Sequence, residues 1–330
     1  MRKIVIYILG FVIVCFAIPV IFTNRPEKEQ ILASSKENAV TENNEPYVYQ
    51  NYGTVELLHE ETGEVENLAM DEYLYGVVSA EMPASFEVEA LKAQAVVART
   101  YTVYKMYKDS KHENADICDQ ADCCQAWISK QDRLDKWNEN ERESNWTKIT
   151  DAVDSTVGKI VTYNAEPINA FFHSNSGGST EIVSNVWGGT DYPYLQSVQT
   201  SGEEGYTQYA STVTLSKEEV LQKIQESHPE AQIDFNIENA IQIIEYTESG
   251  RVKTIQFGNI QISGIEARTM FGLKSAKFSI EITDNVTFNV TGYGHGVGLS
   301  QTGADAMAKT GANYEQIINH YYTDIKIENI

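Results

Sequence analysis

The chain has 330 residues, of which 42% are hydrophobic, so it can form one large domain or two medium ones with buried cores. Its formal net charge at pH 7 is −22, and a surface this acidic repels nucleic acid and anionic lipid head groups. Nucleic-acid binding is therefore not expected, and the substrate should be neutral or held by a local basic patch.

The N-terminus carries a candidate membrane anchor. Residues 4–22 form an uncharged apolar run that is long enough to span a bilayer. Arg2 and Lys3 precede it, which places residues 1–3 in the cytoplasm and the rest of the chain outside. A cleaved signal peptide is the alternative, but the run lacks a convincing cleavage site. We therefore predict a single-pass anchor in the cell membrane, a flexible polar tether at 23–46 and an extracytoplasmic domain at 47–330.

Within residues 47–330, helices and strands fall into separate groups, which favours an α+β fold. A helical catalytic core with a cysteine-containing insertion is expected at roughly 47–200, antiparallel strands at 201–290, and a glycine-rich loop with closing helices at 291–330. Strands are expected at 55–60, 64–69 and 159–163. Helices are expected at 71–81, 86–107, 147–156, 301–309 and 314–321. Asp71 is the expected N-cap of the first helix, and a capping box at Ser216 predicts the start of one more helix.

Glu81 is the strongest candidate for a catalytic acid. Leu74, Val77 and Val78 have the spacing that places them on one helix face with this residue, and Pro83 ends the helix just beyond it. Partial burial and the negative end of the helix dipole both raise the pKa of a carboxyl group in this position. A general acid working near neutral pH needs such a pKa. The alternative is an ordinary solvated glutamate, which is the commoner case for an isolated Glu.

Two basic residues lie on the next predicted helix. Lys92 and Arg99 are seven positions apart and therefore share one stripe of an otherwise apolar surface. Arg99, with its planar guanidinium, would hold a carboxylate or an acetamido oxygen next to Glu81. Alternatively, both side chains point outward or pair with nearby acidic residues.

Two glycine-containing segments supply further polar groups. One is a candidate binding loop in which a Gly pair follows His173, Ser174, Asn175 and Ser176; an ordinary surface loop is the alternative. The other has glycine at every second position around His295 and leads into a helix. Its spacing does not match a dinucleotide or phosphate loop, so nucleotide binding is not supported.

A candidate metal site lies between the helices. His112, Cys118, Cys123 and Cys124 offer four ligands within thirteen residues, which suits tetrahedral zinc. Because Cys123 and Cys124 are adjacent, one sulfur could stay idle. A disulfide from Cys118 to either of them, free thiols, or a catalytic Cys–His dyad are the alternatives.

Four ordered groups of motifs together resemble the stage II sporulation protein D family of lytic transglycosylases, which endospore-forming bacteria use during engulfment. The resemblance runs from about residue 46 to the C-terminus. The motifs are 79–83 with 89–95 and 98–101; 172–178 with 186–189 and 192–195; 262–264 with 271–275; and 294–301 with 320–322.

The resemblance implies an enzyme that cleaves peptidoglycan glycan strands between N-acetylmuramic acid and N-acetylglucosamine, after removal of the stem peptides. It implies stage II sporulation proteins P, an amidase, and M, a membrane protein, as partners in the mother-cell membrane facing the septum. It matches the catalytic acid to Glu81 and the substrate-binding positions to Lys92, Arg99 and 173–176. Some relatives hold zinc in the segment 112–124, often with His-Cys where this chain has Cys123 and Cys124.

A lytic transglycosylase needs only one carboxyl group, so we expect Glu81 to act first as acid and then as base, with a 1,6-anhydro product. Zinc, if bound, is expected to be structural. Two other functions remain open: a non-catalytic glycan-binding enhancer of an amidase, and a Cys/His peptidase acting on stem peptides.

Overall fold

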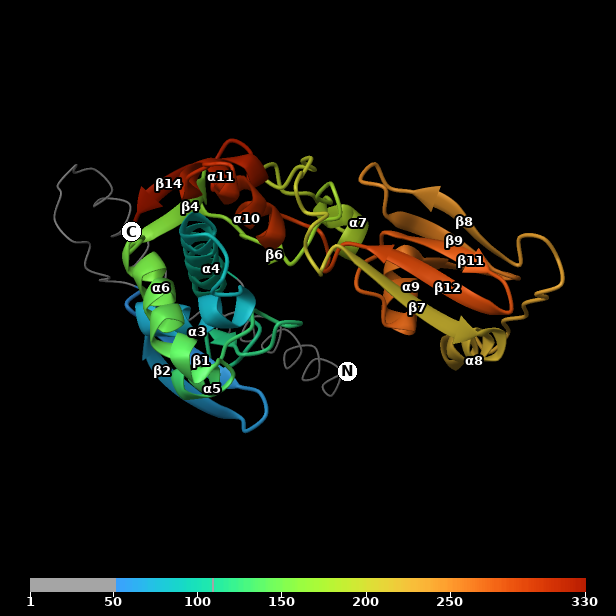
Figure 1. Cartoon of the computed structure of the whole chain (residues 1–330), viewed down its shortest axis with the longest axis horizontal. Coiled ribbons are helices and arrows are strands. Elements are labelled where there is room, and N and C mark those ends of the chain that lie inside the picture. Colours follow the sequence, from blue (N-terminus) through green and yellow to red (C-terminus); the bar gives the residue numbers. More distant parts are fainter. Residues whose placement is uncertain (1–51, 109) are drawn as a thin grey trace, which may run out of the picture. The chain divides into compact units, whose positions relative to one another are not determined.

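The computed structural model describes residues 52–108 and 110–330 (Figure 1). These residues form helices together with several small sheets, most of them antiparallel, which confirms the predicted mixture of α and β structure. The predicted tether at 23–46 lies outside the described residues.

The predicted localisation has to be corrected. Across 52–108 and 110–330, no helix combines the length and the apolar character needed to cross a bilayer. The run at 4–22, on which a single-pass anchor was predicted, is not among the described residues. The prediction of a single-pass membrane protein was therefore wrong for the described residues.

Helix α4 (Val88–Lys108) is the centre of the helical part. It contacts α3 (Met70–Glu81) and α6 (Arg142–Asp154), and also the closing helices α10 (Gln301–Lys309) and α11 (Tyr314–Tyr321). Its middle is buried nearly all round, as its Ala- and Val-rich sequence predicts. Short elements complete this part: β1 (Thr54–His59), β2 (Glu64–Ala69), β3 (Ile117–Cys118), α5 (Lys130–Asp135), η1 (Glu139–Glu141), β4 (Lys159–Tyr163), β5 (Glu166–Pro167), β6 (Phe172–His173) and α7 (Val183–Trp187).

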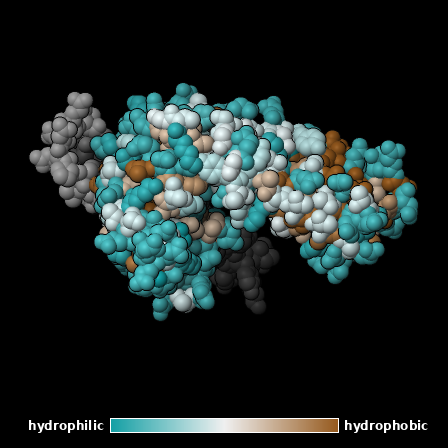
Figure 2. Space-filling view, viewed as in Figure 1, coloured by the Kyte–Doolittle hydropathy of each residue, from teal (hydrophilic) through white to brown (hydrophobic). Residues whose placement is uncertain are grey.

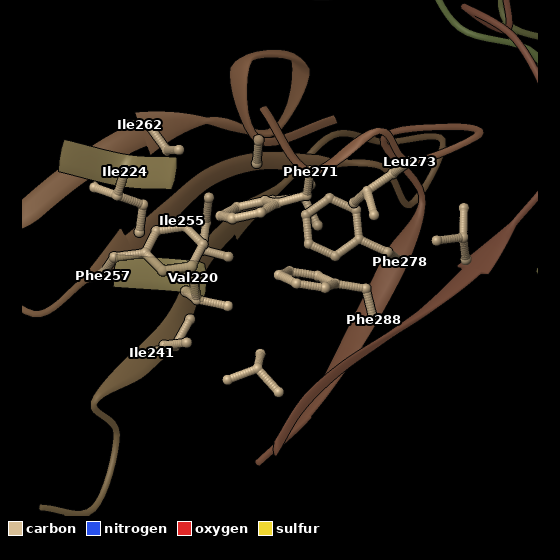
Figure 3. Close-up of a cluster of buried hydrophobic side chains, with 14 of the residues drawn as sticks. Val220, Ile224, Ile241, Ile255, Phe257, Ile262, Phe271, Leu273, Phe278 and Phe288 are labelled. Atoms are coloured by element: carbon tan, nitrogen blue, oxygen red, sulfur yellow. The ribbon is translucent and has the colours of Figure 1, made fainter. Parts of the chain in front are cut away.

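Residues 210–291 build two antiparallel three-stranded sheets with a core of their own. In β12, the alternating Val286, Phe288 and Val290 are buried, as period-two patterning predicts. Phe271 stacks on Phe288 at a centroid distance of 4.8 Å within this core (Figure 3). Its elements are β7 (Ala210–Ser216), α8 (Lys217–Ser227), β8 (Ile241–Tyr246), β9 (Val252–Phe257), β10 (Ile260–Ser263), α9 (Gly264–Phe271), β11 (Phe278–Ile282) and β12 (Asn285–Thr291).

The visible face is largely hydrophilic, and hydrophobic residues gather mainly over the strands of this second core (Figure 2). Ile237 and Ile244 are the most exposed isoleucines of residues 210–291, at 57% and 46% exposure.

The C-terminal elements bring the end of the chain back to the helical part. β13 (Leu299–Ser300) pairs in parallel with β6, and β14 (Lys326–Asn329) pairs with β4. Helices α10 (Gln301–Lys309) and α11 (Tyr314–Tyr321) have the predicted bounds. Other predicted bounds were wrong: α3 begins at Met70 with Ala69 as N-cap, α4 begins at Val88 instead of residue 86, α6 runs from Arg142 to Asp154 instead of 147–156, and β1 is shifted by one residue.

Candidate active site around Glu81

Glu81 is the last residue of α3. Leu74, Val77 and Val78 behind it are fully buried, and Met82 turns to an extended conformation (φ −123°, ψ 141°) before Pro83. This is the conformation expected of a residue that precedes proline. The helix therefore presents a carboxylate at its C-terminal end, supported from behind by an apolar face.

Two donors orient the Glu81 carboxylate. The backbone N–H of Ala126 donates to Oε1 at 2.8 Å, and Nε2 of Gln301 donates to Oε2 at 3.0 Å. Burial raises the pKa of Glu81, and this effect outweighs the two hydrogen bonds, which favour the ionised form. The result is a half-buried, oriented carboxyl group that can carry a proton at higher pH than an ordinary glutamate.

The Ala126 amide is positioned by its neighbours. The buried side-chain amide of Gln125 donates to the Tyr73 hydroxyl at 2.8 Å and to the Thr102 hydroxyl at 2.9 Å. Gly76 of α3 leaves the space in which Trp127 packs, because a Cβ on Gly76 would lie 2.2 Å from the indole nitrogen. Both contacts hold the segment against α3.

Gln301 is positioned by the start of α10. Ser300 is the N-cap, and its hydroxyl accepts a hydrogen bond from the N–H of Gly303 at 3.3 Å. The same hydroxyl donates to the buried carboxylate of Glu203. Gln301 is thus held in place by the pairing of the preceding residues with 172–173, by the N-cap and by the bond to Glu203. It contacts Glu81 although the two residues are 220 positions apart.

Glu81 borders a cleft of about 440 Å³. The cleft is lined by residues 80–85 and by Arg133, Trp137, Glu141, Asn145 and Gln208. A larger hollow of about 660 Å³ along α6 contains none of the predicted site residues. The cleft at Glu81 is therefore the candidate substrate site.

The two predicted basic residues do not reach this carboxylate. Arg99 is fully buried and its guanidinium donates to the carbonyls of Lys159 (3.2 Å) and Val153 (3.4 Å), with Asp71 at 3.6 Å. These contacts tie α4 to α3 and α6. Lys92 pairs with Glu89 at 2.8 Å. Neither residue lines the cleft at Glu81.

His173 and His295 lie together, with ring centroids 5.6 Å apart. Burial, reinforced by nearby Arg251, lowers the pKa of His173 to about 3, and burial also holds the pKa of His295 well below its usual value. Both imidazoles are therefore neutral at physiological pH. The half-exposed Trp187 packs on His295 at 5.0 Å.

The Ser-Asn-Ser segment is tied into a buried network. Asn175 donates to the Thr302 hydroxyl at 2.8 Å, and the Ser174 carbonyl accepts from the N–H of Thr302 at 3.0 Å. Ser176 donates to Glu203 at 2.6 Å. Burial alone would raise the pKa of Glu203, but its many donors outweigh burial and hold that pKa below the usual range. These contacts brace the loop against the start of α10.

The four predicted metal ligands converge. The ligand atoms of His112, Cys118, Cys123 and Cys124 all lie within 4.8 Å of one another. Nε2 of His112 is 3.5 Å from the Cys124 sulfur and 3.9 Å from the Cys123 sulfur. Tetrahedral zinc, with bonds of roughly 2.0 and 2.3 Å to nitrogen and sulfur, requires ligand separations of about 3.5–3.8 Å. The side chains therefore fit such an ion, and all three cysteines are free thiols.

Several residues at the site were not predicted. Gln301 belongs to a motif that the sequence displays, but nothing local indicates that its side chain meets Glu81. Arg133 and Trp137 lie in an acidic, irregular-looking stretch without periodicity. Their four-residue spacing was the available signal, because it suits a cation–π pair on a helix, although Trp137 lies just beyond the end of α5.

Comparisons with known proteins identify the family of the chain. A family model described as stage II sporulation protein matches residues 58–163. The chain is 38% identical to stage II sporulation protein D of Bacillus subtilis (strain 168), over 80% of this chain and 75% of the relative. It is 32% identical to the Bacillus amyloliquefaciens protein of the same name, over 99% of this chain and 96% of the relative. The chain belongs to the stage II sporulation protein D family.

A more distant relative carries a different name. An amidase enhancer of Bacillus subtilis (strain 168) is 28% identical over 76% of this chain, and the match spans 39% of that relative.

The hydrogen bond from Gln301 gives a signed pH prediction. Gln301→Leu removes a donor that stabilises the ionised Glu81, so the pKa of Glu81 should rise further. The acid loses its proton at high pH, so the alkaline limb of the pH–rate profile of any reaction in which Glu81 acts as the acid should move up by about one unit. His173 and His295 are neutral in this range and do not produce the limb.

The control is Gln261→Leu, the same change at an exposed position of β10. An alkaline limb that stays in place, or moves to lower pH, in Gln301→Leu would contradict the assignment of that limb to Glu81.

Proposed function

We propose that this protein is a lytic transglycosylase that cleaves peptidoglycan glycan strands after their stem peptides have been removed. The observation that carries the proposal is the carboxyl group of Glu81, half-buried with a raised pKa, held by two donors and bordering a cleft. Membership of a sporulation family supports a substrate in the cell wall.

In the first step, protonated Glu81 donates its proton to the oxygen between N-acetylmuramic acid and N-acetylglucosamine, and the bond from this oxygen to C1 of muramic acid breaks. In the second step, the Glu81 carboxylate accepts the proton of the muramic acid 6-hydroxyl, whose oxygen bonds to C1. The 1,6-anhydro ring closes, no water is consumed, and Glu81 regains its proton.

Glycoside hydrolases instead use two carboxyl groups. Glu141 also lines the cleft, but it is exposed. A hydrolase and a lytic transglycosylase give different products. Hydrolysis adds one water to the muramic acid end, whereas the 1,6-anhydro end contains no added water. Mass spectrometry of the products from purified, peptide-free glycan should therefore show only anhydro ends. Reducing muramic ends would instead indicate a hydrolase.

Zinc held by His112 and the three cysteines would serve as a structural cross-link. It would join β3 to the segment that carries the Ala126 amide. We keep stage II sporulation proteins P and M as predicted partners. An amidase, as P is expected to be, would produce the proposed substrate by removing stem peptides.

The second candidate function is that of a glycan-binding enhancer of an amidase, which the relative of that name favours. The purified protein alone separates the two functions. A binding protein would sediment with peptide-free glycan and release no soluble fragments.

A further inference from the structure

Arg133 is a cation of the Glu81 cleft that has no anionic partner. It lies on α5, half-buried, with its guanidinium 4.8 Å from the centre of the Trp137 ring. Within 52–108 and 110–330 its guanidinium forms no ion pair and donates no hydrogen bond, and its Nε is buried without a partner. Nε of Arg99 and Nε of Arg251 are buried without a partner as well, so the feature that sets Arg133 apart is a guanidinium that lines a cleft without an ion pair. A half-buried charge without a counter-ion is costly, which suggests that a ligand supplies the acceptor.

Three other arginines within 52–108 and 110–330 have polar partners for their terminal nitrogens. Arg99 contacts backbone carbonyls and Asp71, Arg142 pairs with Asp135 at 3.7 Å, and Arg251 donates to the carbonyls of Ser176 and Ser179. Arg133 differs from these three because it faces a cleft. In a chain of net charge −22, with 47 acidic residues, a cation kept unpaired beside a catalytic carboxyl group calls for an explanation.

The proposed substrate offers a matching anion. N-acetylmuramic acid carries a lactyl carboxylate, and N-acetylglucosamine has none. A guanidinium binds a carboxylate through two parallel hydrogen bonds. Trp137 beneath the guanidinium would hold its plane in place.

We propose that Arg133 binds the lactyl carboxylate of the muramic acid residue whose glycosidic bond Glu81 cleaves, so that it determines which sugar occupies the cleft. This inference rests on the proposed function. It assigns to Arg133 the carboxylate-binding role that the sequence suggested for Arg99, whose guanidinium has partners elsewhere.

The experiment compares two ligands and two proteins. The ligands are peptide-free glycan strands and the same strands with the lactyl carboxylates converted to neutral amides. The proteins are Glu81→Gln, which keeps the ligand intact, and Glu81→Gln combined with Arg133→Gln. With Arg133 present, amidation should weaken binding roughly 10- to 100-fold. With Arg133→Gln, amidation should change binding less than about twofold.

The matched control is Lys136→Gln, which removes the same charge from an exposed position next to α5 that does not line the cleft. It should retain the full effect of amidation, which separates a specific contact from a change in net charge. Arg133→Lys should retain part of the effect, because the charge remains and the planar fork is lost.

An equal effect of amidation with and without Arg133 would overturn the inference. Product analysis of the wild-type protein in parallel keeps the two proposals apart. Absence of cleavage would reject the transglycosylase, whereas cleavage with no role for Arg133 in carboxylate binding would reject this inference alone.

Discussion

Replacement of Glu81 by Gln should lower the rate of anhydro-product formation by about 10²- to 10⁴-fold, the usual contribution of a general acid or base. Gln cannot donate a proton to the glycosidic oxygen or accept one from the 6-hydroxyl. The change is nearly isosteric, so the fold should survive. The rate is measured by mass spectrometry of fragments released from peptide-free glycan over time.

The matched control is Glu72→Gln, an exposed carboxylate on the same helix. It should cleave at the wild-type rate. Unchanged thermal unfolding of Glu81→Gln would confirm that the loss concerns chemistry and not folding. Anhydro-product formation at a near wild-type rate would remove Glu81 from the mechanism.

The second large effect concerns the four-residue metal cluster. Protein purified without chelator should contain about one zinc per chain. Removal of the ion should lower the free energy of unfolding by several kcal/mol and the unfolding temperature by roughly 10 °C. Cleavage should slow as well, because the same segment carries the Ala126 amide and leads into α5 with Arg133.

The matching variant is Cys124→Ser, whose sulfur lies 3.5 Å from His112. Asp122→Asn changes an exposed neighbour outside the cluster and should keep both metal and stability. Re-addition of zinc should restore the wild-type protein but not Cys124→Ser. Absence of metal together with a measurable disulfide would dispose of the site.

Local signals predicted the local structure well. The Ser216 capping box, the bounds of α10 and α11 and the end of α3 before Pro83 all follow from residues within one or two turns. The start of α3 failed because Asp71, a good N-cap residue, lies within the first helical turn near Arg99.

Long-range placement was much harder to predict. The raised pKa of Glu81 was predicted from its helix face, but its partners Ala126 and Gln301 are 45 and 220 positions away. Such contacts depend on how separate elements pack, which periodicity does not encode. The metal ligands were easier to group, because all four fall within thirteen residues.

Arg99 shows how one residue type allows opposite interpretations. Its spacing on a mainly apolar helix fits either a ligand contact or an internal brace. The fold favours the brace, because three polar partners surround a guanidinium with no exposed surface. An arginine is strongly disfavoured in such a position unless it is paired.

The contact between Gln301 and Glu81 also has a consequence for synthesis of the chain. A ribosome makes the helix with the acid early and the residue that orients it about nine-tenths of the way along the 330 residues. Nascent or prematurely terminated polypeptides that stop before position 301 thus contain the acid but lack one of its two fixing groups. The two-donor arrangement of the Glu81 carboxylate would accordingly form only near completion of translation.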